Sequence, residues 1–495
     1  EAERLAISIT KQFPNDQFSW KVLGAVLKQT GRMSEGVIAS QKAVEINPKD
    51  AESHSNLGAA LQDLGRLEEA TVSYRKGIAL KPNLAKIHYN LGSALQEIDK
   101  LDEAEISYRN AITLEPSYTE ALSNLGITLQ GLENFDEAEV VQRQVIAINY
   151  NFTNAHSNLG NTLKELGRLK EAEVSYRQAI AENPNYAEIH YNLGNTLKEL
   201  EQLKEAEVSY RQAIAVNPDY TEAYSNLGLT LQDLDRLEEA EVVYRKAIAV
   251  NPDYAQAYSN LGVTLKELGR LEEAEVSYRE AIKIESNFIE AHNNLGVTLK
   301  DLGRSDEAEV IFRQTIEINP EFAEAYNNLG LTLQELGRLN EAEASYRKAS
   351  ELKPDYADAY YNLGLLLYET KQYEKAIEYF KLHPSEKSKS YLLRCLYLQD
   401  KESLFFDQLD YFINLGEINP MIGSLGCRSA LKYGVEKPNL FCKDPLKYVL
   451  KTDLNSKYDF EKIFVKTTRT VLNDKMIPNR KQGLLTNGYQ TFGNL

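Results

Sequence analysis

The chain has 495 residues, of which 43% are hydrophobic and 26% charged, and its formal net charge is −17 at pH 7. This composition is typical of a folded protein and not of a disordered or fibrous one. The negative charge argues against a non-specific nucleic-acid binder, which needs clustered positive charge to displace phosphate counterions. No apolar run approaches the roughly 18 residues that cross a bilayer. We therefore expect neither nucleic acid nor a membrane among the partners.

Three cysteines lie toward the C-terminal end of the chain, at Cys395, Cys427 and Cys442. No two of them are two residues apart, so the sequence indicates neither a disulfide framework nor a zinc ribbon. The simplest compartment for such a chain is a reducing cytoplasm.

The sequence repeats itself at a constant interval without a gap. The interval is about 34 residues, a length that predicts stacked two-helix units and not separate globular domains. Eleven units run from residue 17 to residue 390 and cover about three quarters of the chain. An Asn followed by Leu-Gly marks ten of these units: Asn56, Asn90, Asn124, Asn158, Asn192, Asn226, Asn260, Asn294, Asn328 and Asn362.

The N-terminal segment keeps the same register, because Ala2 and Pro14 precede Gly36 and Pro48 by one full period. We expect residues 1–16 to form the second helix of a repeat whose first helix is missing. The chain has no initiator Met, so we read it as a fragment in which targeting signals are not observable.

The unit 221–254 illustrates the expected fold of each repeat. Leu227 and Leu231 belong to an apolar stripe with helical spacing, and a second stripe of the same kind follows. Pro252 ends the second helix, and Asp253 is placed to cap the next one. Each unit is therefore predicted to be a pair of antiparallel helices that buries its stripes by stacking on its neighbours.

A glycine recurs in the middle of each first helix, for example at Gly228. Glycine there costs about 0.5–1 kcal/mol relative to alanine, which is tolerated where a neighbouring helix needs the space. We expect Ala240 to mark the matching point on the second helix.

The segment Ala-Tyr-Ser-Asn-Leu-Gly at 223–228, followed by Ala240, Tyr244, Ala247 and Pro252, resembles the tetratricopeptide repeat (TPR) family. This resemblance implies an all-α fold, a right-handed superhelix (α-solenoid) of helix-turn-helix pairs. It also implies that the first helix of each pair lines a concave groove.

The repeats are most similar to those of the O-linked N-acetylglucosamine transferase, in which an asparagine ladder holds the backbone of an extended peptide. By this likeness Asn56 through Asn362 form a ladder of ten rungs. A carboxamide offers one acceptor and two donors, which matches the C=O and N–H groups of any extended chain. The alternative is that duplication copied one tolerated Asn, whose amide bonds an adjacent repeat.

Acidic residues accompany the ladder on the same helix face. Lysines, such as Lys164 and Lys198, offset only part of this charge, so we expect a negative groove that prefers a basic or neutral peptide. The alternative is a solvated surface without a ligand. The predicted groove charges are Glu188, Glu199, Glu222, Asp233, Glu267, Glu290, Asp301, Glu324 and Glu335.

Five of the six histidines occupy one repeat position, where other units have Trp20 or a tyrosine such as Tyr224. This equivalence predicts that their rings pack between helices. A metal site needs several ligands within a few ångströms, whereas these rings lie one or more whole repeats apart. The sequence predicts no metal, no cofactor and no catalytic constellation in the residues given. The five are His54, His88, His156, His190 and His292.

Residues 391–495 are expected to form a smaller, partly irregular region, because the period stops at residue 390. Helices are predicted near 391–400, 403–415 and 459–473, and turn and strand from Gly483 to Leu495. We expect this region to be the start of a truncated domain.

Two strings in this region carry a second resemblance. Asn-Leu-Phe-Cys-Lys-Asp-Pro-Leu-Lys-Tyr at 439–448 and Leu-Leu-Thr-Asn-Gly-Tyr-Gln-Thr-Phe-Gly-Asn at 484–494 look like the lead-in to a 2-oxoglutarate and Fe(II)-dependent oxygenase domain of cyanobacterial, hence bacterial, TPR proteins. Such enzymes need two histidines and a carboxylate, and no histidine follows His383. The resemblance therefore implies chemistry beyond Leu495.

The leading functional hypothesis is a protein-protein interaction scaffold that binds an extended peptide or partner in an Asn-lined acidic groove. One alternative is the substrate-recruiting portion of an enzyme, either the oxygenase or a glycosyltransferase of the O-linked N-acetylglucosamine type, whose catalytic domain follows residue 495. Another is an architectural spacer without a ligand.

Overall fold

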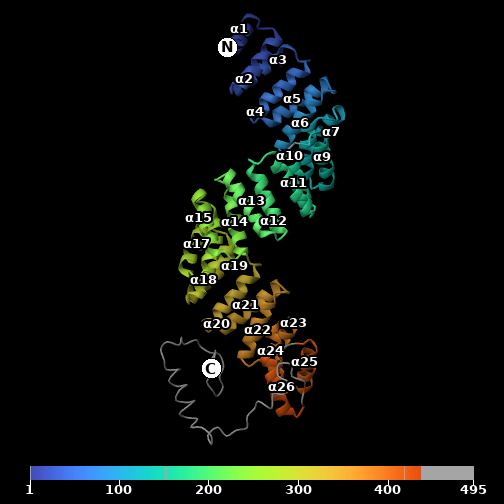
Figure 1. Ribbon diagram of the computed structural model, residues 1–495. Coiled ribbons are helices and arrows are strands. Elements are labelled where there is room, and N and C mark those ends of the chain that lie inside the picture. Colours follow the sequence, from blue (N-terminus) through green and yellow to red (C-terminus); the bar gives the residue numbers. More distant parts are fainter. Residues whose placement is uncertain (1, 151–152, 417–418, 436, 438–495) are drawn as a thin grey trace. The chain divides into compact units, whose positions relative to one another are not determined.

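A computed structural model describes residues 2–150, 153–416, 419–435 and 437. These residues contain 26 helices and no strand (Figure 1). The expected all-α helical repeat fold is therefore confirmed. None of the helices in this part of the chain has both the length and the apolar character that crossing a bilayer requires.

The chain divides into two compact units, Glu1–Pro320 and Glu321–Leu495. The first unit contains α1 (Ala2–Gln12), α2 (Gln17–Gln29), α3 (Met33–Ile46), α4 (Ala51–Asp63), α5 (Leu67–Leu80), α6 (Ala85–Glu97), α7 (Leu101–Leu114), α8 (Thr119–Gly131), α9 (Phe135–Ile148), α10 (Thr153–Glu165), α11 (Leu169–Glu182), α12 (Ala187–Glu199), α13 (Leu203–Val216), α14 (Thr221–Asp233), α15 (Leu237–Val250), α16 (Ala255–Glu267), α17 (Leu271–Ile284), α18 (Ile289–Asp301) and α19 (Ser305–Ile318). The second unit contains α20 (Ala323–Glu335), α21 (Leu339–Leu352), α22 (Ala357–Glu369), α23 (Tyr373–Leu382), α24 (Glu386–Leu398), α25 (Glu402–Asn414) and α26 (Pro420–Tyr433).

Each repeat consists of a first helix of 13 residues and a second helix of 14 residues, as in α4 and α5, except that the second helix of the last repeat, α23, has 10 residues. A short turn between them contains one residue with a left-handed backbone, such as Gly65 with φ 75° or Asp235 with φ 59°. Within each unit, each helix packs on the one before it and the one after it. No repeat could bury its apolar stripes alone, so the core runs from repeat to repeat within a unit.

The tightest packing inside a repeat joins the mid-helix glycine of the first helix to an aromatic ring of the second. A Cβ placed on Gly58 would come within 2.7 Å of the Tyr74 ring, and Tyr74 is 1% exposed. The neighbouring helix therefore does need the space, as expected. The three atoms nearest to a Cβ on Gly228 all belong to the ring of Tyr244.

Most first helices begin without a side-chain cap. The expected cap of α16, Asp253, lies one residue too early, because Tyr254 occupies the N-cap position and makes no side-chain cap hydrogen bond. In the two N-terminal repeats the same position holds Asp16 and Asp50, whose carboxylates accept hydrogen bonds from backbone N–H groups of α2 and α4. The chain therefore uses aspartate caps at one end of the first unit only, among the helices whose caps are described.

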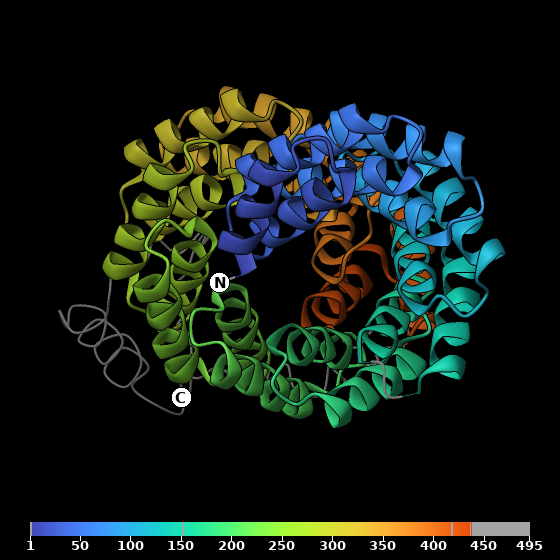
Figure 2. The same cartoon turned by 90° about the horizontal axis from the view of Figure 1, so that it is seen from above.

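Successive repeats of the first unit approach more closely on the side of their first helices. First helices pack directly on one another, from α2 against α4 to α16 against α18, whereas no comparable interface joins successive second helices in the described residues. Ion pairs between long side chains link successive second helices instead. For example, Arg270 Nη1, at the N-terminus of α17, lies 2.7 Å from Glu241 Oε2 on α15. The first helices therefore lie on the inner side of a curve, and Figure 2 shows the curved path of this unit from blue to yellow.

Three helices follow the last repeat of the second unit. Of these, α24 and α25 overlap the helices expected near 391–400 and 403–415. The first begins earlier than expected because Ser385 caps it. The third helix, α26, was not expected; Asn419 caps it and glycines occur in its interior. The helix expected near 459–473 and the strand after residue 483 lie outside the described residues.

Candidate functional site

The ten asparagines of the predicted ladder occupy the sixth position of ten first helices, from α4 to α22. Eight belong to the first unit, and Asn328 and Asn362 belong to the second. Asn56 is exposed, Asn260 is 7% exposed, and the other eight are partly buried. The side chains thus lie at the boundary between solvent and the packing of adjacent repeats.

Several of these amides donate hydrogen bonds to the preceding repeat. Asn226 Nδ2 lies 2.8 Å from Asn195 Oδ1, and Asn192 Nδ2 lies 3.3 Å from Asn161 Oδ1. The same backward direction is found for Asn124 to Tyr89 and Tyr108, for Asn260 to Ser225 and, in the second unit, for Asn362 to Asn327. These amides therefore help to fix one repeat on the next.

The acceptor side of these amides is less occupied. Asn260 Oδ1 accepts a hydrogen bond from Gln256 Nε2 at 2.9 Å. No side-chain hydrogen bond reaches the Oδ1 atoms of Asn124, Asn192 and Asn226 within the described residues. A carboxamide that donates backward while its oxygen stays free can still accept from a backbone N–H group.

The N-terminal rungs differ, because Asn56 and Asn90 line a cavity of about 360 Å³. Three successive first helices, α2, α4 and α6, form this cavity, and its floor includes the small residues Ala59 and Ser93. Neither carboxamide makes a side-chain hydrogen bond to the described part of the chain. The remaining lining residues include Lys28, which is paired with Asp63 at 2.7 Å, and Lys86.

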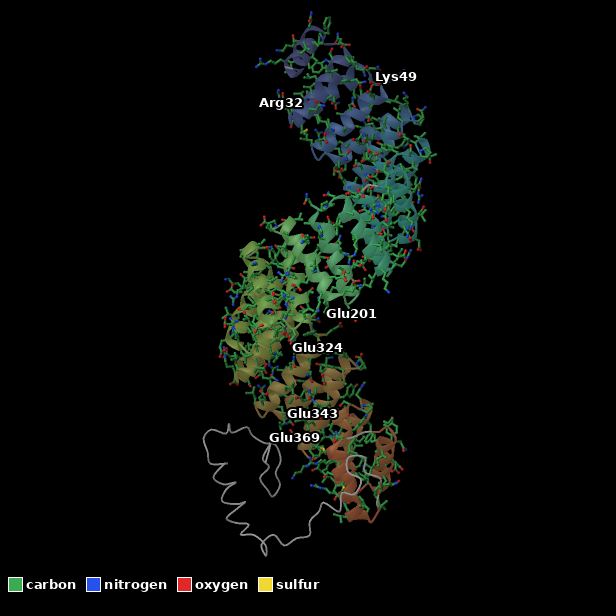
Figure 3. The ribbon with its side chains drawn as sticks, viewed as in Figure 1. Arg32, Lys49, Glu201, Glu324, Glu343 and Glu369 are labelled. Atoms are coloured by element: carbon green, nitrogen blue, oxygen red, sulfur yellow. The ribbon has the colours of Figure 1, made fainter. Side chains whose placement is uncertain are left out.

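Part of the predicted groove charge is neutralised by lysines of the preceding repeat. Glu199 lies 2.9 Å from Lys164. The same spacing along the chain pairs Asp233 with Lys198 at 3.2 Å and Asp301 with Lys266 at 3.3 Å. In the first unit, lysine at one repeat and acid at the next therefore form specific pairs. In the second unit Glu324, labelled in Figure 3, lies 2.9 Å from Lys353 of its own repeat. Glu335 is exposed.

Four of the predicted acids make no ion pair in the described residues of the first unit. They are exposed, so their charge faces solvent. The unpaired acids are Glu188, Glu222, Glu267 and Glu290. The unpaired acids thus lie on four successive first helices, α12, α14, α16 and α18.

The five equivalent histidines pack between helices, as expected. Each Nε2 contacts the backbone oxygen of the residue six positions earlier, for instance Pro184 O at 2.9 Å from His190. The equivalent partners are Pro48, Pro82, Tyr150 and Ser286. Within the described residues no three His, Cys, Asp or Glu side chains are grouped to hold a metal ion.

Sequence reasoning missed the tyrosines that stand next to the ladder. The residue before the ladder Asn is a tyrosine at Tyr89 and Tyr191, where most repeats of the first unit have serine. Tyr191 Oη accepts a hydrogen bond from Asn226 Nδ2 at 3.1 Å, and its ring contacts Tyr220. The departure from serine at this repeat position was the available signal.

Comparison with family models identifies the repeats. Models described as TPR repeat match residues 61–99, 160–201, 194–235 and 333–371. Models described as tetratricopeptide repeat match residues 219–285, 39–71, 277–310, 311–344, 85–118 and 119–149. Together these matches span 39–149 and 160–371, which is more than half of the chain.

Solved structures of repeat proteins are similar to parts of this chain. YrrB, described as a TPR protein with an unusual peptide-binding site, is 26% identical over 37% of this chain and 95% of its own, with a TM-score of 0.32. MamA is 27% identical over 35% of this chain and 94% of its own, with a TM-score of 0.33. The pilF protein of Pseudomonas aeruginosa is 22% identical over 42% of this chain and 97% of its own, with a TM-score of 0.37. Among curated proteins, none matches the chain.

Proposed function

This chain belongs to the tetratricopeptide repeat family, and from that premise we propose that it is a protein-interaction scaffold that holds an extended, basic or neutral peptide segment along its first helices. Solenoids of this kind use their extended concave surface for binding. The partner would lie on the inner side of the curve, where successive first helices approach each other.

The observation that carries this proposal is the pair of unbonded carboxamides in the cavity between α2, α4 and α6. Asn56 and Asn90 line this cavity together with alanine and serine side chains, which leave room for a backbone. A polar group that has no partner in the folded chain is free to bond a ligand without first breaking a native hydrogen bond. Two carboxamides one repeat apart suit an extended chain, whose C=O and N–H groups recur along its length.

The rungs beyond this cavity extend the same surface. The amide N–H groups of Asn124, Asn192 and Asn226 bond the preceding repeat, so these three would serve a peptide mainly through Oδ1, as acceptors for backbone N–H groups. The unpaired carboxylates of Glu188, Glu222 and Glu290 support the preference for a basic or neutral segment, because an acidic segment would be repelled there.

A binding titration tests this function. The probe is a fluorescein-labelled, unstructured peptide of Ala, Ser and Gln, and the variant is Asn56→Ala with Asn90→Ala in the full chain. We expect the affinity to fall about tenfold, because two hydrogen bonds to the ligand are lost. The melting temperature should stay unchanged, because neither amide is bonded within the described residues.

The matched control is Asn110→Ala, which removes an exposed carboxamide from α7, a second helix. This variant should bind the probe like the parent chain. Equal affinity of the double variant and the parent would show that the cavity does not hold the peptide backbone.

The catalytic alternative has no comparable support, because the strings that resemble an oxygenase lead-in, at 439–448 and 484–494, lie outside the described residues. The likeness to the glycosyltransferase rests on the repeats alone, and a fold does not by itself determine an activity.

A further inference from the structure

Two tyrosine pairs with the same geometry lie on the first helices, three repeats apart in the first unit. In the first pair, the ring centroids of Tyr89 and Tyr118 are 5.1 Å apart with an interplanar angle of 37°. In the second pair, those of Tyr191 and Tyr220 are 5.0 Å apart with an angle of 41°. The two sites occupy identical repeat positions, so they form an internal comparison within one chain.

Each pair is held in place by a buried third ring and by a hydrogen bond from an asparagine. The fully buried ring of Tyr210 lies 6.0 Å from that of Tyr191, just as Tyr108 lies 6.0 Å from Tyr89. The ladder asparagine of the next repeat donates a hydrogen bond to the hydroxyl of the tyrosine on the first helix: Asn226 donates to Tyr191, and Asn124 donates to Tyr89. The rings are therefore held in place before any ligand arrives, which reduces the entropy lost on binding.

All four rings are partly exposed, so an aromatic surface is accessible beside the ladder. Burial, together with Tyr89 and Glu120, raises the pKa of Tyr118 to about 12, which keeps this hydroxyl neutral at physiological pH. The face of a neutral tyrosine ring attracts cations through its quadrupole. Arginine suits such a site particularly well, because its planar guanidinium can stack on a ring.

The charges beside the two pairs differ at several positions, since Glu115 also acts on Tyr118 where the second pair has Asn217, and Asp219 precedes Tyr220 where the first pair has Ser117. Glu222 stands beside the second pair and Glu120 at the equivalent position beside the first. The other flanking position holds Glu188 beside the second pair but Lys86 beside the first. Burial, Tyr191, Glu188 and Glu222 all raise the pKa of Tyr220, so both carboxylates act on the second pair. Neither Glu188 nor Glu222 has an ion-pair partner in the described residues.

We propose that the Tyr191–Tyr220 pair, flanked by Glu188 and Glu222, binds an arginine side chain of the peptide held along the first helices. This inference rests on the proposed peptide-binding function and adds a side-chain preference to backbone recognition. The Tyr89–Tyr118 pair binds a cation less tightly, because Lys86 stands there in place of Glu188 and repels a positive charge. An arginine at the second pair would also fix the alignment of the peptide on the otherwise uniform ladder.

The test compares two probes that differ in one residue. The first is a fluorescein-labelled peptide of Ala, Ser and Gln, long enough to reach from the Asn56–Asn90 cavity to α14; the second carries arginine in place of one Gln in its distal half. A series of such peptides moves the arginine along that half. At the best position the parent chain should bind the arginine probe about threefold to tenfold more tightly than the Gln probe.

Two variants locate the site, and each introduces a residue that another repeat already has at the same position. Tyr191→Ser installs the residue that Ser157 and Ser225 have at that position, and Glu188→Lys installs the residue of Lys86. Both should reduce the affinity ratio of the two probes to about one. Tyr89→Ser, the same change at the first pair, should leave the ratio at its parent value.

The outcomes separate this inference from the proposed function. If the parent chain binds both probes equally, or binds a glutamate-substituted probe best, the arginine site is wrong while peptide binding stands. If Tyr89→Ser reduces the affinity ratio to about one and Tyr191→Ser does not, the arginine binds at the Tyr89–Tyr118 pair and the proposed location is wrong. If the parent binds neither probe, the peptide-binding function fails, and the arginine site fails with it.

Discussion

The ring of Tyr244 occupies the space that a side chain on Gly228 would need: a Cβ built on Gly228 would overlap with Tyr244 Cζ. Tyr244 is fully buried, and its hydroxyl donates to Gln232 Oε1 at 2.7 Å. The ring thus closes the gap between α14 and α15 and satisfies its own polar group. Equivalent contacts join Gly194 to Tyr210 and Gly262 to Tyr278.

We predict that Gly228→Ala destabilises the first unit by about 1–3 kcal/mol, because the added methyl group overpacks against a ring that cannot move away. Thermal or urea unfolding measures this loss. The control is Gly269→Asp, at a turn where the left-handed residue of the preceding repeat is already Asp235 and where nothing lies within 4 Å. A Gly228→Ala variant that is as stable as the parent chain would contradict the prediction.

The repeat that contains α8 and α9 lacks the aromatic ring, and Gln142 stands in its place. Gln142 is 1% exposed, its Oε1 accepts from Thr162 Oγ1 at 2.8 Å, and its Nε2 has no partner in the described residues. We predict that Gln142→Tyr stabilises the chain by about 1–3 kcal/mol, because it removes an unsatisfied buried donor and restores the ring opposite Gly126. Gln142→Leu, which removes the donor without supplying the ring, should gain less. A loss of stability in Gln142→Tyr by urea unfolding would contradict this account.

Glu241 joins two second helices, since its carboxylate lies 2.7 Å from Arg245 and 2.7 Å from Arg270. Burial acts to raise the pKa of Glu241, but the hydrogen bonds from the two arginines outweigh it and hold the pKa below its usual value. A carboxyl group with a lowered folded-state pKa contributes stability that is present above its unfolded pKa of about 4.3 and is lost as the pH falls through the folded value.

We therefore predict that the free energy of unfolding falls as the pH drops below about 4.3, and that Glu241→Gln makes this dependence shallower. At neutral pH the same variant should lose about 1–2 kcal/mol. Glu273→Gln is the control, because Glu273 is half exposed and its ion pair with Arg270 is screened by solvent, so it should contribute less than Glu241. Parallel pH profiles for the parent and Glu241→Gln would show that Glu241 is not part of the acid response.

The unpaired carboxylates of the inner face predict a salt dependence of binding. Affinity for the arginine-containing peptide should fall as the salt concentration rises from low to physiological, because exposed charges are screened over about 10 Å at 0.1 M. The neutral peptide serves as the control and should bind with the same affinity throughout. If the two probes respond alike in a fluorescence titration, Glu188, Glu222 and Glu290 only solvate the surface.

The repeat period was sufficient to predict the helix pairs, because apolar spacing and a recurrent proline mark both helices of each unit. It also predicted that Gly228 faces a neighbouring helix. The contact of Gly228 with the Tyr244 ring was not predicted, since an alignment of repeats cannot tell which side chain of the second helix reaches across the gap. The predicted N-cap at Asp253 was also wrong. The backbone enters α16 at Tyr254, one residue after the side chain that is chemically best suited to cap the helix.

The direction of the ladder amides could not be derived from one repeat. Asn226 bonds Asn195, which lies three residues after the ladder position of the preceding repeat, so the interaction exists only between units. For the same reason a triple change of Asn192, Asn226 and Asn260 to Ala would disturb repeat stacking as well as any ligand. The ion pair between Lys198 and Asp233 could not be predicted for the same reason. In an alignment of the repeats the two residues occupy different positions, and only the stacking of one repeat on the next brings them together.

The two sides of the curve are joined by bonds of different reach. Short carboxamide contacts and direct packing link the first helices, whereas the second helices are linked by arginine and glutamate side chains with several rotatable bonds each. Bending such a stack stretches or relaxes the outer pairs while the inner contacts act as pivots. We therefore expect the first unit to bend through small tilts at many interfaces, which add up to a change in curvature, and not at one hinge.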